Sequence, residues 1–160
     1  MTYKLQDTWT IWTHKAKDSN WSPSSYTQLA HFDTIETFGS YFNFFNQSVF
    51  EEKMIFIMKY PIKPIWEDPN ACNGGYWSFK IPNTSIIEVL KKIVLYIVIG
   101  KLDKNYDKKH IIGVSTSPKK GFHIIKIWNN NCHKNDISNI NCEPLDMAQS
   151  DIIYTPFKKK

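Results

Sequence analysis

Short strand patterns recur along the whole chain, and strong helix patterns interrupt them at only two places. The strand patterns cover residues 5–15, 28–31, 54–58, 76–81, 111–117, 123–128 and 152–155. Two of them flank the tight loop Pro118-Lys119-Lys120-Gly121, as the strands of a β-hairpin do. Several strands with few helices predict an α+β domain, in which helices cover one face of an antiparallel sheet.

Both strong helix patterns begin at a sequence that resembles a capping box. The first box is Asp33–Glu36, and phenylalanines at helical spacing follow it to about Asn46. The second is Ser85–Glu88, which opens an apolar stripe that ends at Gly100. We expect a further, weaker helix between residues 135 and 149.

The length of 160 residues predicts a single domain that spans residues 1–160. Three cysteines, Cys72, Cys132 and Cys142, have no CxxC spacing, so we expect neither a metal site nor a disulfide framework, and no cofactor. The most apolar run, residues 93–99, is too short to cross a membrane. We therefore expect a reducing compartment, the cytoplasm.

Aromatic residues make up 15% of the chain, which is more than a core of this size needs. The formal net charge is +5, which favours an anionic partner, and together with the rings it indicates nucleotides or RNA. Trp21, in a polar loop at 18–25, is one ring that could face such a ligand. The alternatives are that Trp21 packs back onto the core and that the charge only keeps the protein soluble.

A loop bounded by prolines, Pro64-Ile65-Trp66-Glu67-Asp68-Pro69, places an indole beside a carboxylate. Trp66 offers a flat face for stacking. The Glu67 carboxylate can accept from two donors that point the same way, a pair that guanine has and adenine lacks. The alternative is that Trp66 is a core residue and Glu67-Asp68 is a solvated turn.

The joint order of several motifs resembles the translation initiation factor 4E family, which binds the 7-methylguanosine cap of messenger RNA. These motifs are Trp9-x-x-Trp12, Trp21, Phe32-Asp33-Thr34-Ile35-Glu36-x-Phe38, Pro64-x-Trp66-Glu67-Asp68, Gly74-Gly75-x-Trp77, Ile99-Gly100 and Lys126-x-Trp128. The match runs from about Leu5 to Trp128 and more faintly to Tyr154. The resemblance implies a curved antiparallel sheet with helices on its convex face and the ligand site on the concave side.

By this resemblance Trp21 and Trp66 sandwich the methylated base, and Glu67 accepts from N1 and N2 of the guanine. Trp128 matches the tryptophan that lies near the methyl group. Methylation at N7 makes the purine cationic, so stacking on the two indoles gains a cation–π contribution.

The match at the phosphate-binding positions is imperfect. Lys119 stands where the family has an arginine, and Ile124 stands where it has a lysine. Lys126, two residues further along the same strand face, and Lys120 in the adjoining loop are the candidates to compensate. The alternative for each lysine, and for Lys120 above all, is a solvated surface charge.

The partner-docking positions of the convex face depart further from the family. Gly39 replaces a tryptophan, and Tyr3-Lys4-Leu5 replaces His-Pro-Leu. Lys91, Lys92 and Ile93 replace tryptophan, leucine and glutamate. We therefore expect poor binding of the usual scaffold motif, and a divergent scaffold partner is the hypothesis that follows.

The resemblance implies a cap-binding protein that acts in translation initiation or its control, and a monomer is the default expectation. Without the usual scaffold dock it could serve a divergent partner, as in a parasite or virus with its own translation factors. An enzyme, such as a cap-directed hydrolase, needs clustered carboxylates or a nucleophile set, and neither is found; the five histidines are scattered. The second hypothesis is a degenerate relative that keeps the fold and serves as a protein-interaction or translation-repressing module.

Overall fold

The computed structural model describes residues 2–105, 109–145 and 147–158. Its strands are β1 (Lys4–Lys15), β2 (Thr27–Thr34), β3 (Lys53–Lys59), β4 (Gly75–Pro82), β5 (Ile111–Pro118), β6 (Phe122–Asn129) and β7 (Ile153–Pro156). Its α-helices are α1 (Ile35–Phe42), α2 (Gln47–Glu52) and α3 (Ile86–Val98).

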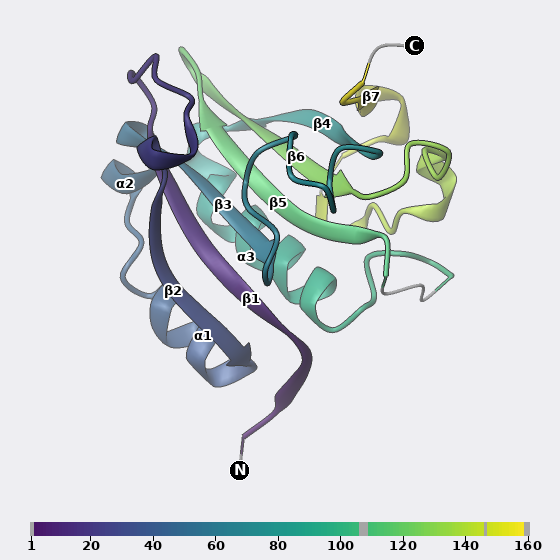
Figure 1. The fold of residues 1–160 in the computed structure, drawn as a ribbon, viewed down its shortest axis with the longest axis horizontal. Helices are drawn as coiled ribbons and strands as arrows, with labels where there is room; N and C mark the ends of the chain where they lie inside the picture. The colour runs from purple at the N-terminus through teal and green to yellow at the C-terminus, as the bar shows by residue number, and fades with distance from the viewer. Residues whose placement is uncertain (1, 106–108, 146, 159–160) are drawn as a thin grey trace.

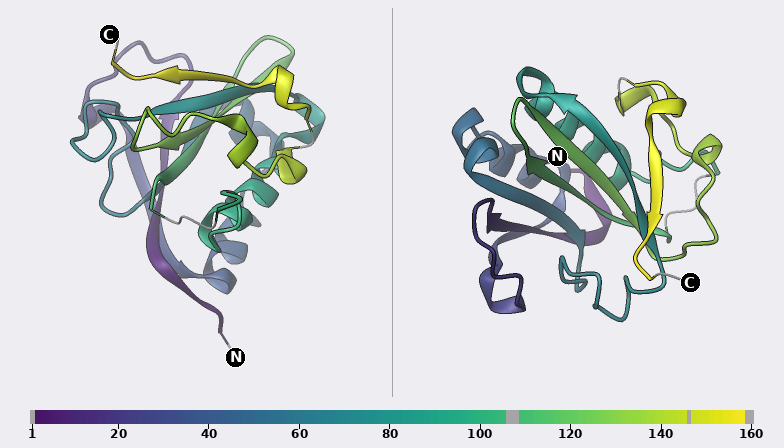
Figure 2. Two further views of the ribbon diagram at one scale, coloured as in Figure 1. Left: turned by 90° about the vertical axis from the view of Figure 1, so that its right-hand side faces the viewer. Right: turned by 90° about the horizontal axis from the view of Figure 1, so that it is seen from above.

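In the described residues the strands form one curved sheet in the order β2-β1-β3-β5-β6-β4-β7, and each neighbouring pair is antiparallel (Figures 1 and 2). The helices lie behind this sheet in Figure 1, and the loop between β3 and β4 crosses in front of it. The predicted α+β architecture, with helices on one face of an antiparallel sheet, is therefore confirmed.

The two faces of the sheet bury different sets of side chains, because successive residues of a strand point to opposite faces. In β3, Ile55 and Ile57 pack into the large core beneath the helices. Phe56 and Met58, from the same strand, belong to a smaller cluster on the opposite face. The large core holds the apolar stripe of α3, namely Ile86, Leu90, Ile93, Val94 and Ile97.

Helix α1 begins and ends differently from the prediction. Its N-cap is Thr34, whose hydroxyl accepts from the Thr37 amide, so the expected box that starts at residue 33 does not form. The Glu36 carboxylate accepts instead from the backbone N–H of Tyr3 and ties the N-terminal segment to the helix. The helix stops at Phe42 because Asn46 caps the separate helix α2.

Helix α3 follows its predicted apolar stripe, but the expected box at its start is wrong: the Ser85 side chain makes no capping hydrogen bond. Its end agrees with the prediction, since Gly100 takes a φ of 76°. In the described part of 135–149 the expected third helix is also wrong, because only short 3₁₀ turns occur, such as Ile137–Asn139. None of the helices in the described ranges is long and apolar enough to cross a membrane.

Candidate functional site

A cavity of about 650 Å³ opens on the sheet face that the helices leave uncovered. Its walls come from the β1–β2 loop, the β3–β4 loop, strands β3 to β6 and the C-terminal segment. The lining residues are Trp21, Tyr26, Met54, Phe56, Pro64, Ile65, Trp66, Glu67, Tyr76, Ser115, Ser117, Lys126, Trp128, Thr155, Pro156 and Phe157. Its size suits a ligand as large as a nucleotide base with its sugar.

Two tryptophans from different loops line this cavity, and both remain half exposed. Trp21 in the β1–β2 loop is 49% exposed, and Trp66 in the β3–β4 loop is 48% exposed. Large apolar side chains of this kind usually lie inside a protein. Two such rings at one cavity, each with surface still open to solvent, are suited to holding a flat ligand.

The β3–β4 loop is held in shape by the buried carboxylate next to Glu67. Asp68 accepts from the backbone N–H of Lys63 at 2.9 Å and from that of Asn70 at 2.9 Å. Its backbone carbonyl also accepts from the amide of Ala71 at 2.8 Å. Asp68 therefore fixes the loop from inside, and this leaves its neighbours Trp66 and Glu67 on the exposed side.

Glu67 supplies negative charge at the cavity wall. Its side chain lines the cavity, and its charge, after burial, contributes to raising the pKa of Tyr26. Within the described ranges no hydrogen bond engages its carboxylate, so both oxygens are available to donors of a ligand.

Trp128 forms the floor between these walls. It is only 6% exposed, and its indole N–H donates to the Ser115 hydroxyl at 3.2 Å. Phe56 meets its ring edge-on at 6.4 Å between centroids, and Phe157 packs on it at 5.0 Å. The floor of the cavity is therefore aromatic, and its indole is held by two ring contacts and a hydrogen bond.

The three predicted phosphate-binding lysines take different places. Lys126 lines the cavity, with its ammonium 4.5 Å from the centroid of the Tyr76 ring. Burial, and secondarily the charge of Lys119, lower the pKa of Lys126. Lys119 thus acts on Lys126 from the β5–β6 turn. Lys119 and Lys120 are both exposed and outside the cavity lining. Ile124 lines a different, smaller cavity farther along the sheet.

Four aromatic residues of the site were missed by the sequence prediction: Tyr26, Phe56, Tyr76 and Phe157. Phe56 and Tyr76 could have been found from strand alternation, since Tyr76 pairs with Trp128 across β4 and β6. Phe157 gave no such signal. Phe157 lies at the cavity because β7, the strand before it, pairs with β4. The backbone N–H of Phe157 also donates to the Gly74 carbonyl at 3.0 Å.

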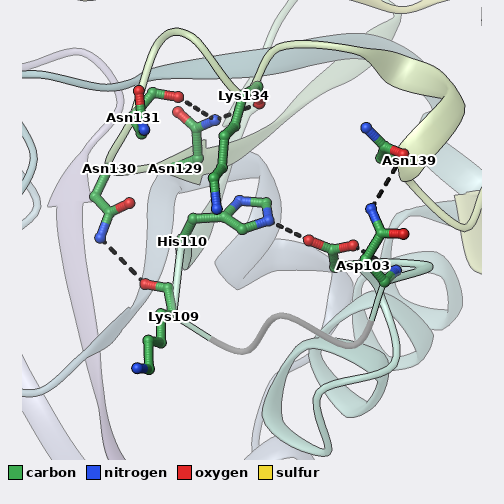
Figure 3. Close-up of polar contacts among 9 residues, drawn as sticks. Asp103, Lys109, His110, Asn129, Asn130, Asn131, Lys134 and Asn139 are labelled. Carbon is green, nitrogen blue, oxygen red and sulfur yellow. Dashed lines mark hydrogen bonds and ion pairs between the residues drawn. The ribbon is translucent and has the colours of Figure 1, made fainter.

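A buried amide, Asn129, locks this C-terminal segment beside the site. Its amide nitrogen donates to the carbonyl oxygens of Asn131 and Lys134 (Figure 3). Its oxygen accepts from the amide of Gly75 at 3.0 Å and from the Tyr154 hydroxyl at 2.8 Å. Burial is the main cause that raises the pKa of Tyr154 to about 12, so this hydroxyl keeps its proton to donate.

The glycines before β4 permit this close packing. A Cβ atom added at Gly74 would lie 1.8 Å from the carbonyl oxygen of Asn129, and one added at Gly75 would lie 2.4 Å from that of Thr155. Both distances are far below van der Waals contact, so any larger residue would push β6 or β7 away. The pair therefore allows β4 to lie close to β6, which carries Trp128, and to β7, which leads into Phe157.

The four predicted docking positions lie on the helix side, away from the cavity. Tyr3 is 60% exposed and Lys92 is exposed on α3, whereas Leu5 is buried in the large core and offers no surface to a partner. A Cβ added at Gly39 on α1 would meet no atom within 4 Å. The surface above Gly39 is therefore open.

The family model for eukaryotic initiation factor 4E matches residues 4–160. The eukaryotic translation initiation factor 4E-2 of Schizosaccharomyces pombe is 29% identical over 143 residues, which are 85% of this chain and 57% of that protein. An isoform 4E factor of Capsicum annuum is 30% identical over 131 residues, 79% of this chain and 64% of that protein. The chain thus spans less than two thirds of the length of these curated relatives.

Solved structures show the same fold at low sequence identity. Ascaris suum eIF4E-3 in complex with the m7G cap superposes with a TM-score of 0.83 at 23% identity, over 100% of this chain and 94% of that one. C. elegans eIF4E-3 in complex with the 4E-binding protein Mextli gives 0.85 at 20% identity, over 98% and 94%. With a family model that extends over almost its full length and a fold that agrees with it, this chain belongs to the eukaryotic initiation factor 4E family.

Proposed function

We propose that the cavity binds the 7-methylguanosine cap of messenger RNA, with the methylated base between Trp21 and Trp66. The observation that carries this proposal is the pair of half-exposed tryptophans on one cavity, from two separate loops. Each stacked indole contributes about 1–3 kcal/mol, and the positive charge of the N7-methylated base adds a cation–π contribution that plain guanine lacks.

Glu67 would recognise the guanine edge by accepting from N1–H and the N2 amino group with its two oxygens. A carboxylate that accepts two parallel donors in this way makes charge-assisted hydrogen bonds, which are stronger than neutral ones. Trp128, on the floor of the cavity, would lie near the methyl group. Adenine has no matching pair of donors, so this contact supplies the choice of base.

Lys126 would bind the cap phosphates, with Lys119 and Lys120 contributing from the β5–β6 turn. Lys126 is the one of the three that lines the cavity. Its pKa is lowered by burial and by Lys119, so an anionic phosphate beside it would relieve the repulsion between the two ammonium groups. A lysine acts as a point charge and cannot form the bidentate fork of an arginine. The phosphates are accordingly held through charge.

Titration of tryptophan fluorescence tests the cap site directly. We expect 7-methyl-GTP to quench the fluorescence at concentrations about tenfold or more below those at which GTP does, at the same salt concentration, because only the methylated base carries the positive charge. Equal, weak quenching by both nucleotides, or none, would contradict cap binding. The chain would then be better explained as a protein-interaction module that keeps the fold.

The protein would act in translation initiation or its control as a binding protein without catalysis, as one cytoplasmic domain over residues 1–160 and as a monomer. A group of His, Cys, Asp and Glu residues able to hold a metal is absent from the part of the chain that the structure describes. Supporting this role, an Ascaris suum relative was solved with the m7G cap and a schistosome relative with m7GpppG and 4E-BP.

Binding of the usual scaffold motif would be weak, because the convex face has lost a large anchor. The surface above Gly39 is open, and Lys92 presents a charge on α3. Loss of one hot-spot side chain can cost about 2 kcal/mol or more of binding free energy. A divergent scaffold, whose own side chain fills the space above α1, would suit this surface better.

A further inference from the structure

His14, near the end of β1, lies flat against the underside of Trp21. The two ring centroids are 4.2 Å apart, and the ring planes differ by only 7°. His14 is 1% exposed, whereas Trp21 is 49% exposed. One face of the Trp21 indole is therefore covered by a buried ring, and a ligand has the other face to stack on.

Both nitrogens of the His14 ring contact the segment that carries Trp21. Nδ1 lies 2.8 Å from the carbonyl oxygen of Lys15, where this segment begins. Nε2 lies 2.7 Å from the carbonyl oxygen of Asn20 and 3.0 Å from the Ser25 hydroxyl, on either side of Trp21. The ring that supports the indole from below thus also contacts the backbone before Trp21 and a side chain after it.

The sheet in turn holds His14. Its neighbour in the ladder is Met54 of β3, and its ring packs at 4.8 Å against Tyr26. Tyr26 meets Phe56, on the site face of the sheet, edge-on at 5.5 Å. A continuous series of rings therefore runs from the sheet to the exposed indole.

We infer that His14 is a positioning residue, which sets the orientation of Trp21 so that the indole already faces the cavity before a ligand arrives. This inference rests on the proposed role of Trp21 in stacking the cap. Without a supporting ring, the indole could rotate about its side-chain bonds or fold down onto the sheet, and binding would have to restrict this freedom. A preset indole avoids that cost.

Three substitutions separate the two contributions of His14. We expect His14→Ala, which removes both the ring and its hydrogen bonds, to weaken 7-methyl-GTP binding about tenfold in the fluorescence titration. His14→Phe keeps a flat ring and should recover binding to within about threefold of the wild type. His14→Gln keeps polar atoms without a ring and should bind less tightly than His14→Phe.

His123 offers a matched control on the opposite face of the sheet. It is also 1% exposed, and its nitrogens lie 2.7 Å from the Asn83 side-chain oxygen and 2.9 Å from the Phe50 carbonyl oxygen. His123→Phe should lower the melting temperature, as a purely structural substitution does, and leave 7-methyl-GTP affinity unchanged.

Trp21→Ala distinguishes failure of this inference from failure of the proposed function. If the wild type shows no preference for 7-methyl-GTP, or Trp21→Ala binds it as the wild type does, the cap site itself is wrong. If Trp21→Ala weakens binding and a folded His14→Ala does not, the positioning role of His14 is refuted. If His14→Ala does not fold, equal or tighter binding by His14→Gln than by His14→Phe refutes it.

Discussion

Glu67 and Asp68 are adjacent carboxylates that the β3–β4 loop uses in different ways. Asp68 is 8% exposed and accepts from the backbone amides of Lys63 and Asn70. Glu67 is exposed at the cavity and takes part in no such bond within the described residues. Charge and size are similar, so burial alone separates a residue that shapes the loop from one that can meet a ligand.

Replacing Glu67 by glutamine should weaken 7-methyl-GTP binding about ten- to hundredfold. The amide offers one acceptor and two donors, so it cannot accept from both N1–H and N2–H₂ of the base, and a charged hydrogen bond worth about 1.5–3 kcal/mol is lost. Fluorescence titration measures the affinity. The melting temperature should stay that of the wild type, because the side chain is exposed.

Asp68→Asn is the control one residue away, and it should show the reverse balance. Its single oxygen can serve one of the two backbone amides, which leaves the other buried without an acceptor and lowers the free energy of unfolding by about 1–3 kcal/mol. Urea unfolding measures this loss. A Glu67→Gln variant that loses stability but keeps its affinity would assign Glu67 to the fold instead of the ligand.

At the scale of elements, the β5–β6 hairpin places one lysine in the cavity wall and two in the turn outside it. Strand alternation puts Lys126 on the same face as Trp128, and the turn, where Gly121 takes a φ of 88°, carries Lys119 and Lys120 outward. The hairpin was predicted from its Pro118–Gly121 loop and is confirmed. The sequence left Lys126 and Lys120 as alternatives to compensate for Ile124, and of these Lys126 lines the cavity.

Lys126→Ala should weaken 7-methyl-GTP binding about tenfold or more, because a charged contact with phosphate is lost. The same substitution should change the binding of 7-methylguanosine, which has no phosphate, far less. Lys120→Ala removes a charge from the same hairpin but outside the cavity lining, so it should weaken 7-methyl-GTP binding less, by about two- to threefold, and leave 7-methylguanosine binding unchanged. Equal losses in both variants would indicate a general field of charge in place of a specific contact.

Helix α1 offers a gain-of-function test of the convex face. A Cβ atom added at Gly39 meets no atom within 4 Å, and tryptophan is a better helix former than glycine, so α1 should tolerate the exchange. Gly39→Trp should therefore tighten binding of a 4E-binding-protein peptide about tenfold or more, as measured by isothermal titration calorimetry. Affinity for 7-methyl-GTP should not change.

The wild-type protein is the reference in that titration, and we expect it to bind the 4E-binding-protein peptide weakly. Tight binding of the peptide by the wild type would show that Gly39 is no obstacle. Failure of Gly39→Trp to improve binding would place the loss elsewhere on the face, with exposed Lys92 on α3 as the next residue to exchange.

For the whole molecule, the order of strand and helix patterns was enough to predict the fold class, because alternation and apolar stripes report burial directly. The two predicted capping boxes failed for local reasons: Thr34 caps α1 in place of Asp33, and the Ser85 side chain makes no capping hydrogen bond at α3. The spacing of residues reveals neither. The third helix, expected between 135 and 149, was wrong because the described residues form separate 3₁₀ turns at Ile137–Asn139, Glu143–Leu145 and Gln149–Asp151.

The cavity was predictable only in part, since it is assembled from segments far apart in the sequence. Trp21, Trp66, Glu67, Lys126 and Trp128 were named from motifs, and the structure brings all five to one cavity. Phe157 and the His14 support depend on strand pairing and on side-chain contacts across a loop, and no local pattern encodes either. Such partners become visible only when the sheet order is known.

The sheet divides the molecule into a face that stabilises it and a face that is open to ligand, and this division can be measured by ligand-induced stabilisation. A ligand at about 100 times its dissociation constant raises the free energy of unfolding by about 2.7 kcal/mol. We expect 7-methyl-GTP to raise the melting temperature of the wild type accordingly. Without ligand, Trp66→Ala should melt at a temperature close to that of the wild type, because the Trp66 ring is 48% exposed. With 7-methyl-GTP it should lose most of the increase, because a stacking partner of the base is missing.

Leu90→Ala tests the other face. Leu90 is 1% exposed in the core under α3, so its truncation should cost about 2–5 kcal/mol of stability. The increase in melting temperature on adding 7-methyl-GTP should nevertheless persist, since the cavity lies across the sheet from this residue and shares no lining with it. If Leu90→Ala abolished the increase while remaining folded, the two faces would be energetically coupled through the sheet, and the loops that carry the tryptophans would depend on the helix-side core for their geometry.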